Sequence, residues 1–407
     1  MDAATLSLLA EGPGRELLDS LGPYAADAAL SLSSRLRAAG HDPELVTAVL
    51  AQARLRGLAV EKFGDAAPAM LFTADGVEQA TRPALADRHA RRFVEAGVGS
   101  VIDLGCGIGS DAIAFARAGL SVTAVEVDPV TAAVARANLA AWPAAVVVES
   151  PAEQVSLPRE ASGRHTGVWV DPGRRVSGVR EIDGRARRVF SLDAISPSWQ
   201  QVLAWASQLR ATGAKLAPAF PHAAIPIGAE TQWTSWRGEV LECAVWWGPL
   251  VRVPGRTAAV CRPGEPAAVV TEADLTGQPA LGAATELGPW LVEADRAVVR
   301  AGLSGALPGR ELSAGVGYSS TAEPIDLPWA RRYAVVEALP LRAKVIRAWL
   351  RARGIGSVTV KKRGSAVDVE ALRREISVRG LPGTATLLAT SVAGQGMAIV
   401  VEPTPTG

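Results

Sequence analysis

The sequence predicts an α/β protein with a central parallel sheet, preceded by a helical region and followed by a small α+β layer. Two observations predict the sheet: the apolar run 100–104 breaks into three alternate glycines, and a second apolar run, 122–125, ends in an acid. A helical pattern separates these runs, so together they form the strand, turn, helix and strand of a βαβ unit. A third observation, the alternation of strand and helix patterns after residue 331, predicts the C-terminal layer.

The glycine turn suits a ligand that contains a nucleoside. Gly105, Gly107 and Gly109 let the backbone approach a ligand closely at a helix N-terminus. Glu126, at the tip of the second strand, can accept hydrogen bonds from the two hydroxyls of a ribose. We therefore predict a Rossmann-like sheet with a cofactor at this turn. A turn with a purely structural role is the alternative, but it does not explain why acids stand at both strand ends.

The spacing of the turn narrows the choice of cofactor. Dinucleotide-binding turns usually read G-x-G-x-x-G, whereas this turn reads D-x-G-x-G-x-G and begins at Asp103. A carboxylate there suits a ligand that carries an amino group. The pattern resembles motif I of the class I S-adenosyl-L-methionine (SAM) methyltransferases. The resemblance implies that Asp103 and the glycines cradle the methionine end of SAM, that Asp111 also contacts it, that Glu126 holds the ribose, and that no metal is required.

Length and composition set the broad class. A chain of 407 residues with 48% hydrophobic and 20% charged residues predicts two or three folded domains with a sizeable core. No run of about 18 apolar residues appears, and the first twelve residues carry acids where a signal peptide needs a basic start, so we expect a cytoplasmic protein without a signal peptide. The three cysteines and four histidines lack the spacing of a disulfide framework or a zinc site.

Charge is unevenly distributed along the chain. Residues 331–407 contain 13 Lys or Arg against 5 Asp or Glu, while the rest of the chain contains 29 against 36. A basic module of charge +8 thus follows an acidic body of charge −7. This asymmetry is typical of nucleic-acid binding. Basic helix faces that are simply solvated are the alternative.

The segment before the glycine turn carries a second resemblance. Residues 1 to about 60 read as helices that form a structural cap, and the segment 72–81 then contains Phe-Thr, a glycine and Glu-Gln-Ala-Thr. This segment resembles the bacterial methyltransferases that carry a C-terminal THUMP-like domain. The resemblance implies that it closes over SAM, which makes candidate contacts of Thr73, Glu78, Gln79 and Thr81. A turn at 75–76 followed by a helix cap at Thr81 is the alternative.

The ends of later strands supply the remaining candidates. Ser150, after the third strand, is a candidate contact for the adenine end of SAM, although no residue there matches the methyltransferase pattern cleanly. The fourth strand ends in Asp171-Pro172-Gly173-Arg174-Arg175. Ligands meet an open parallel sheet at the carboxyl ends of its strands, so we expect Asp171 beside the methyl group of the cofactor.

The residues around Asp171 depart from a well-known pattern. Methyltransferases that act on exocyclic amines of bases carry a second proline and an aromatic residue where this chain has Gly173 and Arg174. The D-P-x-R-R motif is usual in the THUMP-like group, and we assign Asp171, Arg174 and Arg175 to catalysis. The two arginines could stack on a base or grip phosphate, or could pair with carboxylates at the sheet edge.

The rest of the methyltransferase region is less specific. The charged loop 180–188 is either a substrate-capturing loop or a solvated one. A fifth strand at 214–218 brings Lys215, and by inference His222, toward the same edge of the sheet. The tryptophan-rich stretch 232–253, with Gly248-Pro249 turning the chain, predicts a hairpin whose tryptophans belong to the core, and a base-stacking platform is the alternative. Residues 290–303 look helical.

The last unit has the clearest order of elements. Strands are expected at 333–338, 357–361, 384–391 and 397–401, and helices at 341–353 and 369–379, an order that fits a ferredoxin-like α+β layer. The stretch Lys361-Lys362-Arg363-Gly364 resembles part of the THUMP-like domain, and three adjacent cations can hold a phosphate backbone. A solvated strand edge protected by lysines is the alternative.

We therefore expect an N-terminal helical region at 1–62, a methyltransferase domain at 63–255, a linker or insertion with short strands at 256–330, and a basic THUMP-like domain at 331–407. The resemblance covers nearly the whole chain and implies a SAM-dependent methyltransferase that acts on an RNA base, in rRNA or tRNA. Two rivals stay open: a small-molecule methyltransferase, and an inactive protein that binds SAM and RNA.

Overall fold

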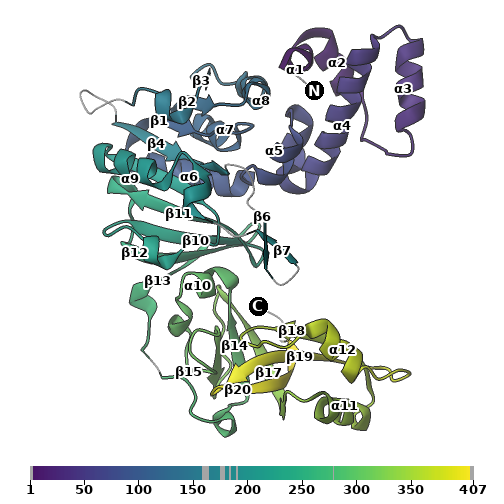
Figure 1. Ribbon diagram of the computed structural model, residues 1–407, viewed down its shortest axis with the longest axis vertical. Helices are drawn as coiled ribbons and strands as arrows, with labels where there is room; N and C mark the ends of the chain where they lie inside the picture. The colour runs from purple at the N-terminus through teal and green to yellow at the C-terminus, as the bar shows by residue number, and fades with distance from the viewer. Residues whose placement is uncertain are drawn as a thin grey trace. The chain divides into compact units, whose positions relative to one another are not determined.

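The computed structural model describes residues 3–157, 165–174, 179–182, 185–188, 191–277 and 279–403 (Figure 1). The chain forms two compact units, 1–216 with 245–252 and 217–244 with 253–407. Within the described residues, none of the helices combines the length and the apolar composition needed to cross a bilayer. Arg175 lies outside the described residues, and the backbone of Arg174 is described without its side chain.

The N-terminal part of the first unit is helical, as the sequence predicts. Its helices are α1 (Ala3–Ala10), α2 (Gly12–Ser20), α3 (Ala29–Ala38) and α4 (Pro43–Phe63). The longest, α4, begins at Asp42, whose carboxylate accepts hydrogen bonds from the N–H groups of Glu44 and Leu45. Pro43 follows at the first helical position, where a missing N–H costs nothing.

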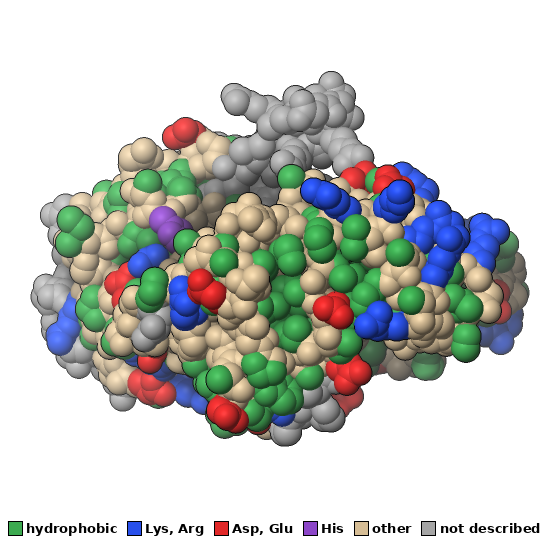
Figure 2. All heavy atoms as spheres, turned by 90° about the horizontal axis from the view of Figure 1, so that it is seen from below, with side chains coloured by type: hydrophobic (Ala, Val, Ile, Leu, Met, Phe, Trp, Pro, Cys, Tyr) green, Lys and Arg blue, Asp and Glu red, His purple; other side chains and the backbone are tan. Residues whose placement is uncertain are grey.

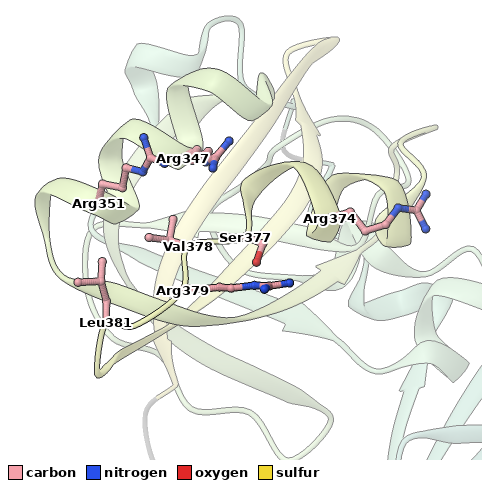
Figure 3. Close-up of a pocket in the computed structure, with 7 residues that line it drawn as sticks. All are labelled: Arg347, Arg351, Arg374, Ser377, Val378, Arg379 and Leu381. Atoms are coloured by element: carbon pink, nitrogen blue, oxygen red, sulfur yellow. The ribbon is translucent and has the colours of Figure 1, made fainter.

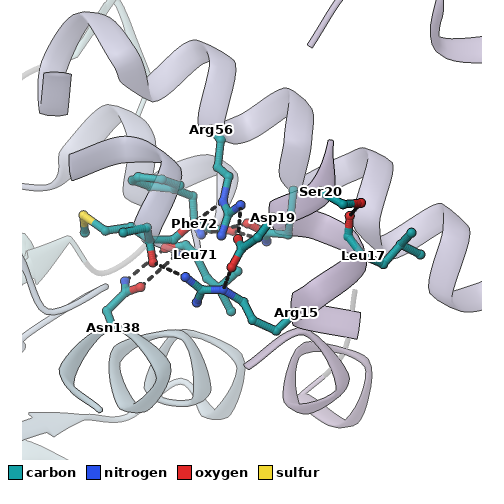
Figure 4. Close-up of polar contacts among 11 residues, drawn as sticks. Arg15, Leu17, Asp19, Ser20, Arg56, Leu71, Phe72 and Asn138 are labelled. Atoms are coloured by element: carbon teal, nitrogen blue, oxygen red, sulfur yellow. Dashed lines mark hydrogen bonds and ion pairs between the residues drawn. The ribbon is translucent and has the colours of Figure 1, made fainter. Parts of the chain in front are cut away.

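These helices hold the segment that precedes the glycine turn (Figure 4). Gln52 of α4 donates to the carbonyl of Phe72 at 2.7 Å and accepts from its N–H at 3.0 Å. On the other side, Asn138 accepts from the N–H of Leu71 at 2.8 Å and donates to its carbonyl at 3.0 Å. The Asn138 amide also donates to the carbonyl of Ile108 within the glycine turn. Side chains thus satisfy a buried backbone segment that belongs to no sheet.

A parallel sheet forms the centre of the first unit and confirms the predicted Rossmann-like fold. Its strands lie in the order β3-β2-β1-β4-β9, followed by β11. Four helices pack against the sheet or against one another. The bounds are β1 (Val98–Leu104), β2 (Ser121–Glu126), β3 (Ala145–Glu149), β4 (His165–Val170), β9 (Ala211–Leu216), β11 (Glu239–Trp247), α6 (Pro83–Glu95), α7 (Ser110–Arg117), α8 (Pro129–Leu139) and α9 (Trp199–Gln208).

Tryptophans fill the core, as the sequence predicts. Trp169 of β4 and Trp246 of β11 stack with ring centroids 5.1 Å apart, and both are buried. A Cβ atom at Gly213 would lie 2.7 Å from Trp246 and 2.8 Å from Trp169. The glycine in β9 is therefore required by the space that the two indole rings occupy.

Short elements connect the main strands. Helix α5 (Ala74–Gln79) lies between the segment held by Gln52 and helix α6. After β4 come a short pair, β5 (Gly173–Arg174) with β8 (Ile195–Ser196), and a hairpin, β6 (Val179–Ile182) with β7 (Arg185–Arg188). The β6–β7 hairpin is the backbone of the charged loop that the sequence analysis singles out.

The second unit contains most of the tryptophan-rich hairpin, but the turn between its strands lies at 237–238 and not at the predicted 248–249. Strand β10 (Glu230–Trp236) turns into β11 through Arg237 and Gly238, both of which have positive φ. Two positive φ values in a two-residue loop match the twist of antiparallel strands. Strands β12 (Gly255–Cys261) and β13 (Ala268–Thr271) continue the order β11-β10-β12-β13.

A seven-stranded sheet forms the rest of the second unit, in the order β15-β16-β14-β17-β20-β19-β18. From residue 330 onward the elements follow the predicted βαβαββ order, which is confirmed. The β18–β19 pair is parallel and its neighbours are antiparallel, so the sheet is mixed. Helices α11 and α12 lie side by side beside it (Figure 1). The bounds are β14 (Trp290–Ala294), α10 (Arg296–Arg300), β15 (Arg310–Glu311), β16 (Tyr318–Thr321), β17 (Ala330–Pro340), α11 (Ala343–Ala352), β18 (Ile355–Lys362), α12 (Val369–Ile376), β19 (Gly383–Val392) and β20 (Gln395–Pro403).

The predicted helix over 290–303 is wrong in its first half. Residues 290–294 form strand β14, which pairs with β16 on one side and β17 on the other. Leu291 and Val292 are buried there. Hydrogen bonds to two neighbouring strands and burial on both faces override the local helical pattern. Only 296–300, in α10, is helical.

The glycine turn after β1 has the conformation that its composition predicts. Gly105, Gly107 and Gly109 have φ values of 86°, 56° and 88°. A Cβ atom at Gly105 would lie 2.4 Å from the carbonyl oxygen of Asp171, whereas one at Gly107 would meet no atom within 4 Å. The first glycine is therefore needed for both its conformation and its space, and the second for its conformation alone.

These two glycines make a matched pair for a stability test. Gly105→Ala adds backbone strain and a steric overlap, so we expect it to lower the free energy of unfolding by roughly 3 kcal/mol. Gly107→Ala adds only the strain of a left-handed residue, about 1 kcal/mol. Urea denaturation of both variants measures the difference. Equal destabilisation by the two substitutions would contradict the packing of Gly105 against Asp171.

Candidate functional site

Four chemistry-bearing residues meet at the carboxyl edge of the first sheet. In the parallel register, Leu104 of β1 lies opposite Val125 of β2 and Val170 of β4, and Val170 lies opposite Ala214 of β9. The residues that follow in each strand are therefore neighbours at this edge: the glycine turn, Glu126, Asp171 and Lys215. Asp103, one residue before Leu104, lies next to them in β1.

Asp103 is a buried carboxylate without a counter-charge in direct contact. Its side chain is 1% exposed, and neither oxygen has a hydrogen-bond partner among the described residues. Burial raises the pKa of Asp103 well above its usual value, and the negative charges of Asp111 and Asp171 raise it further. A buried carboxylate without a partner lowers the stability of the protein when no ligand is bound. A ligand with a cationic donor at this point would compensate it.

Glu126 is held in place by backbone donors. One carboxylate oxygen accepts from the N–H groups of Val127 at 2.9 Å and Asp128 at 3.0 Å, and the other accepts from the N–H of Gly107 at 3.0 Å. A carboxylate offers about four acceptor positions. Three are used, so one position on the oxygen that faces Gly107 can accept from a ligand hydroxyl.

A chain of polar contacts links the segment before the turn to the sheet edge. Lys215 lies 2.5 Å from a carboxylate oxygen of Asp171 and donates to the Thr81 hydroxyl at 2.8 Å. The Thr81 hydroxyl donates to Asp111 at 2.5 Å. Asp111 also lies 2.8 Å from Nδ1 of His89, on α6. These five residues, which we call the edge network, connect β4, β9, α6 and α7.

The edge network explains the charge of Asp111. Burial alone would raise its pKa, but the charge and hydrogen bond of His89, together with Lys215 and Thr81, lower the pKa below the ordinary value. The Ser110 hydroxyl also donates to the carbonyl of Thr81 at 2.6 Å. Thr81 and Asp111 thus bind each other and fix the start of α7 to the preceding segment.

The other candidate cofactor contacts have more varied surroundings. The Thr73 hydroxyl accepts from the N–H of Gly76 and caps α5. Glu78 and Gln79 are exposed. The N–H of Ser150 donates to the carbonyl of Glu126 at 3.0 Å, and its hydroxyl donates to the carbonyl of Pro151. The fold therefore brings Ser150 beside Glu126 but does not direct Gln79 toward a partner.

Two further residues of the site carry no motif in the sequence. His89 lies buried on α6 with its ring centroid 4.5 Å from that of Trp169. The Lys62 ammonium donates to the carbonyls of Val77 and Glu78 in α5. Burial, followed by the positive charge of Lys215, lowers the pKa of Lys62 to about 8. In the sequence, the one signal for these residues is that Lys215 belongs to a strand that reaches the same edge of the sheet. No motif indicates that His89 and Lys62 lie near it.

The three cations predicted to contact phosphate all form contacts with other residues of the second unit. Lys361 donates to the Tyr333 hydroxyl at 2.7 Å, and Arg363 lies 3.3 Å from Glu293 of β14. The hydroxyls of Tyr333 and Tyr318 both donate to Glu293. Lys362 is exposed and donates to the carbonyl of Val367. His222, inferred to lie near the catalytic edge, contacts the carbonyl of Arg300 and the Trp233 ring within the second unit.

Three family models match the chain. Residues 102–162 match one described as a methyltransferase domain, and residues 330–403 match one described as THUMP domain-like. Residues 2–59 match a domain of unknown function (DUF8688). The second and third matches coincide with the mixed sheet's βαβαββ portion and with the N-terminal helices.

Relatives and solved structures agree with these matches. Uncharacterized S-adenosylmethionine-dependent methyltransferases from two strains of Mycobacterium tuberculosis are 30% identical over 375 residues, which cover 88% of this chain and 96% of theirs. The crystal structure of a proposed methyltransferase from Porphyromonas gingivalis superimposes with a TM-score of 0.67 at 15% identity, covering 94% of this chain and 100% of that one. The chain therefore belongs to the SAM-dependent methyltransferases that carry a C-terminal THUMP-like domain.

Proposed function

We propose that the protein transfers the methyl group of SAM to RNA, with the acceptor held at the carboxyl edge of the first sheet. The observation that carries the choice of RNA is the combination of a methyltransferase domain with a basic THUMP-like domain at 330–403. A small-molecule methyltransferase would have no evident use for a terminal module of charge +8. Bound SAM supplies the methyl group as an electrophile.

The residues at the glycine turn suit SAM. Its ammonium group can donate to the unpaired, buried carboxylate of Asp103, and a ribose hydroxyl can donate to the remaining acceptor position of Glu126. The turn and edge together carry the carboxylates of Asp103, Asp111, Glu126 and Asp171. Lys215 and His89 lie against Asp171 and Asp111, so Asp103 and Glu126 are the acids that favour a ligand with an ammonium and a sulfonium. Ser150, beside Glu126, is the candidate neighbour of the adenine.

Asp171 is the proposed orienting group for the acceptor. It follows β4 directly, and its N–H donates to the carbonyl of Leu104, which fixes its backbone beside Gly105. The carboxylate can accept the N–H or O–H of the atom to be methylated. The ammonium of Lys215, 2.5 Å from a carboxylate oxygen, holds that side chain in one place. Methyl transfer requires an in-line approach to the methyl carbon, so positioning should account for much of the rate.

Replacing Asp103 tests the contact with the amino group of SAM. Asp103→Asn removes a charge-assisted hydrogen bond, so we expect the affinity for SAM to fall by about 10- to 100-fold. Burial raises the pKa of Asp103 in the free protein, so its carboxylate is protonated at a higher pH than that of an exposed aspartate. The wild-type affinity should therefore fall as pH decreases through that raised pKa, by up to about tenfold per pH unit.

Calorimetric titration with SAM across a pH series measures both effects. The Asn variant should bind weakly and lack the part of the pH dependence that Asp103 causes. A wild-type affinity that stays constant with pH, or an Asn variant that binds SAM as well as wild type, would rule out this role of Asp103.

Replacing Lys215 tests the edge network. Lys215→Met removes the ammonium from Asp171 and Thr81 while keeping a side chain of similar length. We expect kcat for methyl transfer to fall by about 100-fold because the acceptor is misplaced, with the Kd for SAM changed only a few-fold. Single-turnover kinetics and SAM titration separate the two. A loss confined to SAM affinity would assign Lys215 to the cofactor instead of the acceptor.

Radiolabelled SAM tests the choice of acceptor. The protein is incubated with methyl-labelled SAM and either total RNA or a bacterial small-molecule extract. We expect label in RNA that ribonuclease releases, and none with Glu126→Ala, which loses the ribose contact. Label transferred only to small molecules, or no transfer to RNA despite measurable SAM binding, would overturn the proposal. Full-length variants are preferable to a truncation at 331, because β17 pairs with β14 and its removal would expose that strand.

A further inference from the structure

Four arginines surround a hollow of about 690 Å³ in the second unit (Figure 3). Arg347 and Arg351 come from α11, Arg374 from α12, and Arg379 from the loop after α12. Ser377, Val378 and Leu381 complete the lining. We infer that this arginine hollow is the surface that grips the phosphate backbone of the RNA acceptor. The inference rests on the proposed function and adds the place where the RNA binds.

The two helices present these arginines because their other faces are committed to the core. Ile346, Trp349 and Leu350 of α11 are buried, as are Leu372 and Ile376 of α12. Arg347 and Arg351 are four residues apart and therefore share one exposed stripe of α11. The close-up shows them approaching the hollow from one side, with Arg379 crossing below Ser377.

These four charges lack an ion-pair partner within the part of the chain that the structure describes. All four arginines are exposed, and none forms an ion pair with an acid among the residues that the structure describes. The nearest pair on α12 joins Glu370 to Arg373, which is not part of the hollow. Like charges at this spacing on a helix repel one another. A polyanion would relieve the repulsion.

Figure 2 shows Lys and Arg side chains gathered at one end of the visible face.

The arginine hollow differs from the Lys361-Lys362-Arg363 stretch in what its cations contact. Lys361 and Arg363 surround Glu293 and two tyrosines, so much of their charge is already used inside the fold. Arg363 also donates to the carbonyls of Ala294 and Gly317. These contacts of Lys361 and Arg363 anchor β18 to β14, which makes the arginine hollow the stronger candidate for the phosphate backbone.

The chemistry of the hollow suits phosphate groups. The planar fork of a guanidinium matches two phosphate oxygens, which a point charge does not. Four arginines from three successive pieces of chain around a concave space suit a bent, irregular backbone such as that of folded RNA. A membrane surface is flat and would be contacted by cations in one plane. Contacts of this kind position an RNA without reading its sequence.

Removing the four charges tests the inference. The variant Arg347→Gln, Arg351→Gln, Arg374→Gln and Arg379→Gln is compared with wild type for binding to fluorescein-labelled bulk tRNA over a range of salt concentrations. We expect the affinity to fall about tenfold or more, and the slope of log K against log salt to decrease by about 3, because four phosphate contacts are lost. Circular dichroism and SAM titration should match wild type.

A matched variant controls for net charge. Arg35→Gln, Arg37→Gln, Arg54→Gln and Arg91→Gln also removes four exposed arginines, all in the first unit. We expect its RNA affinity and salt slope to stay close to those of wild type. An equal loss in the control variant, or none in the hollow variant while wild type binds and methylates RNA, would overturn the inference and leave the proposed function standing.

Two other outcomes, one in RNA binding and methyl transfer and one in vesicle binding, would overturn the inference. If wild type binds no RNA and transfers no label to it, the proposed function fails and the inference fails with it. If the hollow variant loses binding only to vesicles of phosphatidylcholine and phosphatidylserine, and not to tRNA, the surface recognises lipid and the inference is wrong.

Discussion

The arrangement of the first unit depends on one buried charge. Asp103 stands at the end of the central strand with both carboxylate oxygens unpaired and its pKa raised by burial. A folded protein retains such a group at a cost in stability, and groups with strongly shifted pKa values cluster at functional sites. The glycines beside it keep the space in front of the strand free of side chains. We propose that the carboxylate and the turn together receive the amino group of the cofactor.

Among the described residues, the neighbouring elements stabilise this edge without donating a hydrogen bond to the Asp103 carboxylate. Lys215 pairs with Asp171, and His89 contacts Asp111, so the other acids at the edge have their own partners. The N-terminal helices contribute from further away, since Gln52 of α4 holds the segment that leads into Thr81. Asn138 of α8 holds the same segment from the other side and also donates to the carbonyl of Ile108 in the glycine turn.

Local chemistry allowed the sequence to predict the turn, the parallel sheet and the order of elements in the last unit. The spacing of the glycines, the ends of the strands and the alternation of strands and helices after residue 331 each depend on a short stretch of sequence. The pairing of Lys215 with Asp171 depends on β9 lying next to β4 in the sheet. A short stretch of sequence carries no information about which strands become neighbours. The same reason explains β14, whose two partner strands lie later in the chain. It also explains why Lys361 and Arg363, which look like free cations in sequence, surround Glu293 in the structure.

A crystal structure of the complex with S-adenosyl-L-homocysteine tests the central claim most directly. This product keeps the amino group and the ribose of the cofactor. We predict that its amino nitrogen lies within hydrogen-bond distance of the Asp103 carboxylate, and that a ribose hydroxyl donates to Glu126. A bound product whose amino group contacts other residues, with Asp103 still buried and unpaired, would contradict the account.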